Sequence, residues 1–530
     1  MGVTTILDIL DRSVERHGDR PAVRNLSEIP AEPREIDYAS LRDESQRLAA
    51  GLLRRGVSKG DRVVLLSPPR IRFAVTTLAA LRIGAWIVPI DPSLTREEIA
   101  TICGHAEPKA IFAAGELLDR TPEAPLRVDL DDDAATPYST LLNESQAPFP
   151  SVQAEDIAFL AYTSGTTGNP KGVMLSHGNV TSDLVHGTKV IPVYPDDVFL
   201  AIAPWHHILG LVACLILPFY GGALAMYTDE YRRIAEIMKD HGVSIFIGVP
   251  KLFHALFERL HARVASTLAG RLAWRFAPRL IGRSIAKRLT GGRLRFFVSG
   301  SAPLDPQVAL GFRRLGIGMM EGYGLTETSP VVSVCDPFSR KAGSVGRPLP
   351  TVEARILDPW PDGVGELLVR GPIVMQAYYR NPEATAAAID AENWFHTGDL
   401  AVLDGEGEIH LRGRAKNVIV LATGKNVYPE ELEWEIGRIP YVEEVMVRYR
   451  PSDGTIEAIV YPSQEQLKAA GAGERAREII WGEIRTRLQR LAPYKRLRSI
   501  RQLVLAARPF PKTSTLDIRR HLVDREERPT

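Results

Sequence analysis

The sequence predicts an α/β fold, because helical patterns alternate with short apolar strand patterns along most of the chain. The alternation is clearest within residues 35–120, where each helical stretch is followed by a short strand of the buried type. Further short runs rich in β-formers, each ending at Gly or Pro, indicate that the same layers continue. The helices are expected at 41–56 and 73–84, and the strands at 61–67, 85–91, 198–204, 243–250 and 294–300.

The last third of the chain has a different pattern, with β-hairpins followed by a short α+β stretch. Gly-rich turns between apolar runs predict hairpins at 365–371, 396–414 and 416–429. The α+β stretch is expected to hold helices at 429–440 and 475–491 and strands near 443–448 and 457–461. We therefore predict a large N-terminal domain of layered α/β subdomains plus a β-barrel-like subdomain over 1–413, and a small α+β C-terminal domain over 416–530.

The composition is typical of a soluble globular protein with more than one domain. The chain of 530 residues is too long for one hydrophobic core, and its 45% hydrophobic and 24% charged residues are ordinary proportions. A net charge of +1 gives no general attraction to nucleic acid, so no nucleic-acid partner is expected. Scattered cysteines and the lack of an apolar signal at the N-terminus favour a cytoplasmic location.

Residues 198–228 contain no Asp, Glu, Lys or Arg, which raises the question of a membrane span. Pro204, Pro218 and the pair Gly221-Gly222 interrupt this run, and two adjacent histidines lie within it. These interruptions favour a buried helix followed by a buried strand.

Residues 259–304 contain no acidic residue, and basic residues recur there at every fourth position. This spacing places them on one face of a helix, which Pro278 interrupts. Apolar residues such as Trp274 and Phe276 lie on other faces, so the basic segment 259–295 could rest peripherally on anionic lipid. A solvated basic face and a patch for an anionic substrate tail are the alternatives. The recurring basic residues are Arg271, Arg275, Arg279, Arg283 and Lys287.

The string YTSGTTGNPKG (162–172) has the composition of a phosphate-binding loop but not the spacing of a Walker A loop. Pro170 stands where that loop has its second glycine, and Gly172 stands where its Ser or Thr binds Mg²⁺. Hydroxyls and backbone N–H groups bind phosphate oxygens, glycines allow close approach of the backbone, and Lys171 adds a positive charge. The string therefore predicts a phosphate site that differs from that of the P-loop NTPases.

At this string the chain resembles the adenylate-forming (AMP-binding) enzymes, which include acyl-CoA synthetases, luciferases and peptide-synthetase adenylation domains. Further motifs of that family follow in the family's order over nearly the whole chain. The segment before RFFVSGSAPL and the phrase NVIVLATGKNVYPEELE are most similar to long-chain fatty acyl-CoA synthetases. The motifs are APWHHILG (203–210), SGSAPL (299–304), EGYGLTET (321–328), GSVGRPLP (343–350), WFHTGDL (394–400) and GRAKNVIVLATGKNVYPEELE (413–433).

Enzymes of this family join a carboxylic acid to an acceptor in two steps. The carboxylate attacks the α-phosphate of Mg-ATP to give an acyl-adenylate and pyrophosphate, and a thiol, usually that of coenzyme A, then displaces AMP. The resemblance implies an acid-thiol ligase (an AMP-forming acyl-CoA synthetase) that uses ATP, Mg²⁺ and coenzyme A on a small-molecule carboxylic acid such as a fatty acid. An adenylating enzyme with a carrier protein or an amine as acceptor is an alternative.

The resemblance also implies which residues do this work. Lys171, Thr326, Glu327 and His207 would be catalytic: Lys171 binds the β- and γ-phosphates, Thr326 contacts the α-phosphate, Glu327 holds Mg²⁺ and His207 stands at the entrance of the acyl pocket. Tyr323 would stack on adenine, Asp399 would accept from the ribose hydroxyls, and Arg414 would support ribose and phosphates. The nucleotide would be bound by Thr163, Ser164, Gly165, Thr166, Thr167, Gly168, Lys171, Gly300, Ser301, Ala302, Tyr323, Gly324, Thr326, Asp399 and Arg414.

The resemblance further implies a mobile C-terminal domain with a hinge near Lys416. Hinges need only a few residues that change their backbone angles. Rotation about Lys416 would bring the loop 424–430 to the active site for the thioester step.

The last motif of the family, Pro-x-Thr-x-x-Gly-Lys-Ile-x-Arg, is altered in this chain. Its counterpart is PKTSTLDIRR (511–520), which puts Asp517 at the position of the family's catalytic lysine. A lysine there stabilises charge on the α-phosphate, whereas a carboxylate would repel that charge. Lys512 lies too far along the chain to take its place, and Arg519 is closer. A nucleotide-binding homologue with impaired adenylation is therefore a further alternative.

Overall fold

The structure, a computed structural model, forms two compact units. The first comprises Met1–Ala354, Val369–His396 and Asp404–Ile409, and the second comprises Arg355–Leu368, Thr397–Leu403 and His410–Thr530. The domain boundary expected at 413–416 stays a prediction. The residues described are 2–27, 29, 32–133, 136–143, 148–163, 170–300, 302–421, 425–451, 454–512, 518–520 and 522–523.

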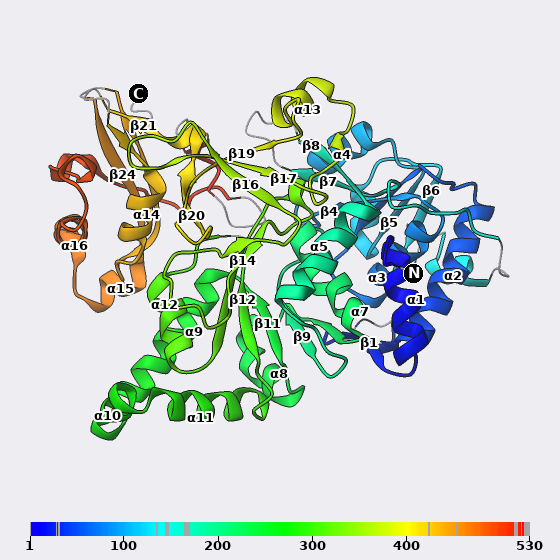
Figure 1. Cartoon of the computed structure of the whole chain (residues 1–530), viewed down its shortest axis with the longest axis horizontal. Coiled ribbons are helices and arrows are strands. Elements are labelled where there is room, and N and C mark those ends of the chain that lie inside the picture. Colours follow the sequence, from blue (N-terminus) through cyan, green and yellow to red (C-terminus); the bar gives the residue numbers. More distant parts are fainter. Residues whose placement is uncertain are drawn as a thin grey trace. The chain divides into compact units, whose positions relative to one another are not determined.

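The first unit contains a nine-stranded sheet in the order β15-β14-β13-β12-β11-β9-β10-β1-β2 (Figure 1). Its central strands run parallel, and three of them are the predicted strands β9 (Val198–Ala201), β11 (Ile245–Gly248) and β12 (Phe296–Ser299). Helices α8 (Ile234–Asp240), α9 (Pro250–Ala265), α11 (Pro278–Thr290) and α12 (Pro306–Arg314) bury apolar side chains against it. The other strands are β1 (Pro21–Asn25), β2 (Glu35–Asp37), β10 (Leu224–Tyr227), β13 (Gly318–Tyr323), β14 (Ser333–Val334) and β15 (Arg347–Pro348).

A seven-stranded sheet in the same unit has the order β18-β8-β7-β4-β3-β5-β6. The predicted strands are β3 (Arg62–Leu66) and β4 (Trp86–Ile90), which pair in parallel, and the predicted helices are α2 (Tyr38–Arg54) and α3 (Ile71–Arg82). Strand β8 pairs antiparallel with both β7 and β18. The remaining elements are β5 (Ala110–Ala113), β6 (Leu126–Asp129), β7 (Ile157–Thr163), β8 (Lys171–Ser176), β18 (Ala377–Tyr378), α1 (Ile6–His17), α4 (Arg96–Ala106), α5 (His177–Val190) and α13 (Pro382–Ala388).

The charge-free run 198–228 forms a helix followed by a strand, as predicted. After β9, the chain passes through α6 (Ile208–Leu211), a π-helical turn (Val212–Ile216) and α7 (Leu217–Gly221), and then enters β10. Side chains of this run such as Leu211, Cys214 and Phe219 are fully buried. Among the described residues, no helix has both the length and the apolar character needed to cross a membrane.

The C-terminal part has the α+β pattern that the sequence predicts. Helix α14 (Pro429–Gly437) and strands β23 (Val442–Arg450) and β24 (Thr455–Pro462) share one apolar core with α16 (Ala476–Leu488). The predicted hairpin at 416–429 contains the antiparallel pair β21 (Ile419–Val420) and β22 (Asn426–Val427). A four-stranded sheet holds β16 (Glu353–Leu357), β17 (Gly365–Arg370), β19 (Phe395–Leu403) and β20 (Ile409–Arg414), and the last elements are α15 (Gln464–Ala469) and β25 (Leu503–Leu505). These observations confirm the α/β fold class.

Candidate active site

Several predicted site segments leave the nine-stranded sheet at the same edge. Strands β9, β11, β12 and β13 are parallel neighbours, so the segments that follow β9, β12 and β13 start at their shared carboxyl edge. This edge is where ligands bind in open α/β sheets. A side chain on Gly300 would lie 3.0 Å from Leu209 Cδ2, so the SGSAPL segment touches the APWHHILG segment. Gly300 and Ala302 are at this edge, and Ser301 lies outside the described residues.

A tight turn after β13 holds Thr326 and Glu327 in place. Tyr323, the last residue of the strand, is buried, and Thr326–Thr328 form a 3-10 turn. Gly324 has no room for a side chain, because a Cβ atom there would lie 1.9 Å from the carbonyl oxygen of Pro330. Within the turn, the backbone N–H of Leu325 donates to Thr328 Oγ1 at 2.8 Å. The close packing fixes the direction of the Thr326 and Glu327 backbone.

The two ends of the predicted phosphate loop lie side by side. Thr163 ends β7 and Lys171 begins β8, and these two residues face each other in the antiparallel ladder. The predicted phosphate loop therefore connects two strands that pair antiparallel. Its residues Ser164, Gly165, Thr166, Thr167 and Gly168 lie outside the described residues.

Tyr378 connects Lys171 with Glu327. Its hydroxyl donates to Glu327 Oε1 at 2.8 Å, and the Lys171 ammonium lies 4.8 Å from the centroid of its ring. Burial and the Glu327 carboxylate raise the pKa of Tyr378 well above its ordinary value, so the hydroxyl keeps its proton and stays a donor. The predicted phosphate-binding lysine and the predicted magnesium ligand therefore both contact one tyrosine. The sequence did not predict Tyr378 as a site residue.

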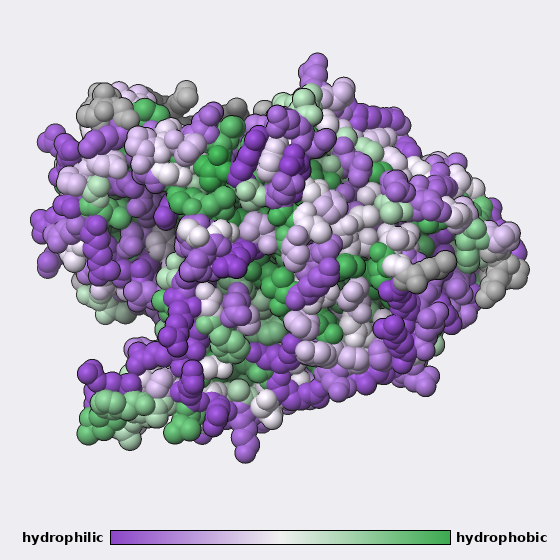
Figure 2. Space-filling view, viewed as in Figure 1, coloured by the Kyte–Doolittle hydropathy of each residue, from purple (hydrophilic) through white to green (hydrophobic). Residues whose placement is uncertain are grey.

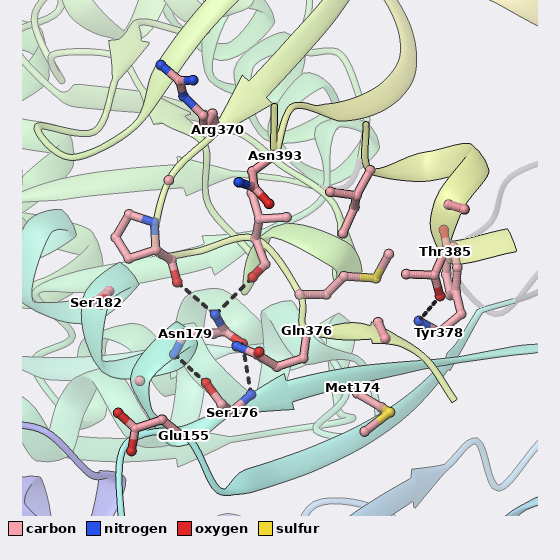
Figure 3. A pocket seen from close by; sticks show the side chains of 18 of the residues that line it. Glu155, Met174, Ser176, Asn179, Ser182, Arg370, Gln376, Tyr378, Thr385 and Asn393 are labelled. Atoms are coloured by element: carbon pink, nitrogen blue, oxygen red, sulfur yellow. Dashed lines mark hydrogen bonds between the residues drawn. The ribbon is translucent and has the colours of Figure 1, made fainter. Parts of the chain in front are cut away.

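Tyr378 lines a pocket of about 1140 Å³ beside β8 and α5, and other residues that line this pocket hold Tyr378 in place (Figure 3). The side-chain amide of Asn179 donates to the carbonyl oxygens of Pro372 at 2.7 Å and Val374 at 2.9 Å. These bonds fix the segment that leads into β18, and the backbone N–H of Tyr378 donates to Thr385 Oγ1 at 3.0 Å. Tyr378 is therefore anchored on both sides of the short strand β18.

His206 and His207 lie together after β9. Their rings are 4.4 Å apart, and His206 Nε2 lies 3.7 Å from Asp91 Oδ1. Burial, reinforced by His207, lowers the pKa of His206 to about 4, so this imidazole is neutral at pH 7. His207 is at the N-cap of α6, two residues before Leu209, the residue whose side chain lies close to Gly300. Its role at the entrance of an acyl pocket, which the family resemblance implies, stays a prediction.

Glu321, in β13 before the turn, is a buried carboxyl group with a shifted pKa. Burial raises its pKa to about 7, although Arg313 lies 3.5 Å away and opposes the shift. A carboxyl with a raised folded-state pKa binds a proton more readily in the folded state. The free energy of unfolding therefore falls as the pH rises from about 4.5 to about 7.

We expect that Glu321→Gln removes the part of the fall in the free energy of unfolding between pH 4.5 and 7 that comes from Glu321. The variant should match the wild-type Tm at pH 5 and exceed it at pH 8, by an amount equivalent to about 1–3 kcal/mol. Other carboxyl groups titrate alike in both proteins, so the difference between the two melting curves isolates Glu321. An equal shift at both pH values would show that Glu321 does not titrate in this range.

Two further predicted residues belong to the second unit, where they form an ion pair. Arg414 Nε, at the end of β20, lies 2.8 Å from Asp399 Oδ1 on the neighbouring strand β19. The Asp399 side chain is buried, and its backbone N–H donates to Thr397 Oγ1 at 3.0 Å. The structure thus joins the two residues that were predicted to hold the ribose.

The segment around the predicted C-terminal lysine position is only partly described. Lys416 lies in the 3-10 turn Ala415–Asn417, directly after β20, and Asp517 lies outside the described residues. Lys512 forms an ion pair with Glu444, whose other oxygen accepts from the backbone N–H of Phe510 at 2.6 Å. Lys512 therefore anchors the chain to β23.

Sequence comparison gives one family and several relatives. The family model of the AMP-binding enzymes matches residues 10–379. The peroxisomal long chain acyl-CoA synthetase 7 of Arabidopsis thaliana is 30% identical over 497 residues, which span 83% of this chain and 70% of that protein. The long-chain-fatty-acid–CoA ligase of Escherichia coli O157:H7 is 30% identical over 508 residues, 86% and 84% of the two chains. A feruloyl-CoA synthase of an Amycolatopsis species is 32% identical over 433 residues, 78% and 80% of the two chains.

Solved structures share the fold. The ATP-bound structure of MatB from Rhodopseudomonas palustris matches with a TM-score of 0.77 and 26% identity, over 98% of this chain and 99% of that one. The anthranilate CoA ligase AuaEII in complex with anthranoyl-AMP matches with a TM-score of 0.80 over 99% and 98% of the two chains. At 21% identity, the second likeness shows the fold alone.

Proposed function

Because the chain belongs to the AMP-binding enzyme family, we propose that it activates a fatty acid as an acyl-adenylate and then transfers the acyl group to coenzyme A. In the first step, a carboxylate oxygen attacks the α-phosphorus of ATP and the bond to pyrophosphate breaks. In the second step, the thiol sulfur attacks the acyl carbon, AMP leaves, and the thiol proton passes to solvent. The chain is thus an acid-thiol ligase that uses ATP, Mg²⁺ and coenzyme A.

The observation that carries this proposal is the Lys171–Tyr378–Glu327 cluster. Lys171 supplies a positive charge at the end of a hairpin loop rich in hydroxyls and glycines, which is the chemistry that phosphates require. The neighbouring carboxylate of Glu327 is oriented by the Tyr378 hydroxyl. A cation and a carboxylate that contact the same tyrosine suit a metal-nucleotide substrate, in which both phosphate oxygens and a metal ion must be held.

Glu327 is a fitting ligand for Mg²⁺, which prefers carboxylate oxygens. Its Oε1 accepts from Tyr378, and its Oε2 has no hydrogen-bond partner within the described part of the chain. When bound, Mg²⁺ neutralises part of the phosphate charge. Tyr378 acts on the metal through Glu327, so it is a positioning residue.

We expect Tyr378→Phe to weaken the use of Mg²⁺. Loss of one hydrogen bond to a carboxylate costs about 1 kcal/mol, so the Mg²⁺ concentration for half-maximal rate should rise about fivefold. The rate at saturating Mg²⁺ should fall less. Tyr379→Phe is the matched control, because the Tyr379 ring contacts Trp86 and His105 and its hydroxyl has no partner among the described residues. Equal effects of the two variants would remove the assigned role of Tyr378.

The experiment that tests the function follows pyrophosphate and AMP with ATP, Mg²⁺ and a panel of acids, with and without coenzyme A. The panel includes straight-chain fatty acids of increasing length and aromatic acids such as ferulic acid, because one relative is a feruloyl-CoA synthase. The proposal expects fastest turnover with a fatty acid and AMP release that depends on coenzyme A. Faster turnover of an aromatic acid would contradict the substrate class. AMP release that coenzyme A does not change would contradict the acceptor.

Asp517→Lys should raise the rate of adenylation at least tenfold, which corresponds to about 1.4 kcal/mol. The substitution removes a carboxylate and supplies a cation at the position where the family has its catalytic lysine. Lys512 is held by Glu444 in the structure, which supports the view that it does not take over this role. Acid-dependent pyrophosphate release measures the gain, and Asp517→Ala separates the loss of repulsion from the new cation. A change below twofold would mean that another cation already acts there.

A further inference from the structure

Helix α10 (Leu268–Phe276) and the start of α11 expose a row of large apolar side chains. Leu268, Leu272, Phe276 and Leu280 are spaced four residues apart and are 68%, 51%, 75% and 64% exposed. No residue of α10 is fully buried. Exposed apolar side chains are ordinary when they are scattered, whereas a continuous row marks an interaction site.

The apolar row is not the face by which α10 and α11 pack on the core, because other side chains of these two helices make the core contacts. Trp274 lies 5.9 Å from the ring of Phe257 on α9, and Ile285 of α11 is buried in the core beneath the nine-stranded sheet. Arg314 of α12 donates to the carbonyl oxygens of Trp274 and Arg275 at 3.3 and 3.2 Å. The helices are therefore fixed on their inner side, and the apolar row faces solvent.

Basic side chains flank the apolar row on both helices. All of them are exposed, and none has an acidic partner in the described part of the chain. The guanidinium of Arg275 lies 5.6 Å from the centroid of the Phe276 ring, so cation and apolar group stand side by side. Since residues 259–304 hold no acidic residue, nothing on these helices neutralises the charge. The basic residues are Arg271, Arg275, Arg279, Arg283, Lys287 and Arg288.

Figure 2 shows the result as green atoms set among purple ones over α10, at the lower left where Figure 1 places this helix. We propose that α10 and α11 form a docking surface for an anionic lipid bilayer. The leucines and Phe276 enter the boundary between headgroups and acyl chains, and the arginines bind the anionic headgroups. An anionic bilayer accounts for both the apolar row and the basic side chains that flank it, whereas a nucleic acid would leave the leucines without a role. The proposal does not depend on the proposed function.

The direct test is flotation of the full-length protein with vesicles. The protein should float with vesicles of phosphatidylcholine that contain one third phosphatidylglycerol, and binding to pure phosphatidylcholine should be at least tenfold weaker. Raising the salt concentration should reduce the binding, because screening weakens attraction to the headgroups. Equal binding to both vesicles, or binding to neither, would overturn the proposal.

Two variants assign the binding to this surface. Leu272→Ser/Phe276→Ser and Arg275→Glu/Arg279→Glu should each lower binding to the anionic vesicles at least tenfold. The side chains are exposed, so Tm and the turnover of a soluble acid should stay unchanged. Matched controls are Phe338→Ser, also exposed and apolar, and Arg485→Glu/Arg490→Glu on and after α16, and these should bind as the wild type does.

A second copy of the chain is the competing occupant. Light scattering without lipid should give the same molar mass for the wild type and for Leu272→Ser/Phe276→Ser. A dimer that this double substitution dissociates would assign the surface to self-association and overturn the lipid proposal.

Discussion

Lys171→Met lowers the rate of acid-dependent adenylation by at least about 100-fold. The substitution keeps the length of the side chain and removes the only charge of the 162–172 string. Removing one group that stabilises charge in the transition state costs about 3–4 kcal/mol, or a factor of roughly 10²–10³. The loss should fall on kcat as well as on kcat/KM for ATP, because the leaving pyrophosphate gains charge as its bond breaks. Pyrophosphate release under saturating ATP measures it.

Lys189→Met is the control for Lys171→Met. Lys189 lies exposed in the last turn of α5 in the same unit, and its loss should leave the rate within twofold of the wild type. The Tm of both variants should stay close to that of the wild type. A Lys171→Met enzyme that keeps more than a third of the wild-type kcat would show that this lysine does not act on the phosphates.

Glu327→Gln is expected to lower kcat/KM for Mg-ATP by about 100-fold or more. Glutamine has the same shape and its side-chain oxygen still accepts from Tyr378, so the turn after β13 should be preserved. What is lost is the negative charge that Mg²⁺ prefers among its ligands. The measurement is the initial rate as a function of Mg²⁺ concentration, in which raised Mg²⁺ should restore only part of the activity.

Glu97→Gln, on the exposed first turn of α4, is the matched acid-to-amide control and should change nothing. The double variant Tyr378→Phe/Glu327→Gln gives a further check. Because Tyr378 acts through the Glu327 carboxylate, its loss should cost little once that carboxylate is gone. Fully additive effects would mean that the hydrogen bond between them has no part in metal use.

The layered fold could be predicted from the sequence, because it depends on local patterns. Strands such as β3 and β4 are short apolar runs, and helices α2 and α3 fill the intervals between them. The two faces of α10 and α11 could not be told apart. Both the inward Trp274 and the outward Phe276 are aromatic, and which of them packs against the core depends on where α9 and α12 lie.

The candidate site residues that lie in motifs could be named from the sequence, whereas the contacts that depend on pairing between distant strands could not. Lys171, Thr326 and Glu327 stand inside recognisable strings, so their types and spacing signal their chemistry. Tyr378 follows Glu327 by 51 residues and reaches it because β18 pairs with β8, a register that no local pattern encodes. The pair Asp399–Arg414 likewise depends on the neighbouring strands β19 and β20.

The exchange of labelled pyrophosphate into ATP tests adenylation most directly, because it reports the reversal of that step alone. The protein should catalyse exchange with Mg²⁺ and a fatty acid in the absence of coenzyme A, and Lys171→Met should lower the exchange rate by at least about 100-fold. Absence of exchange with every acid of the panel, or conversion of ATP to ADP and phosphate, would contradict the assignment.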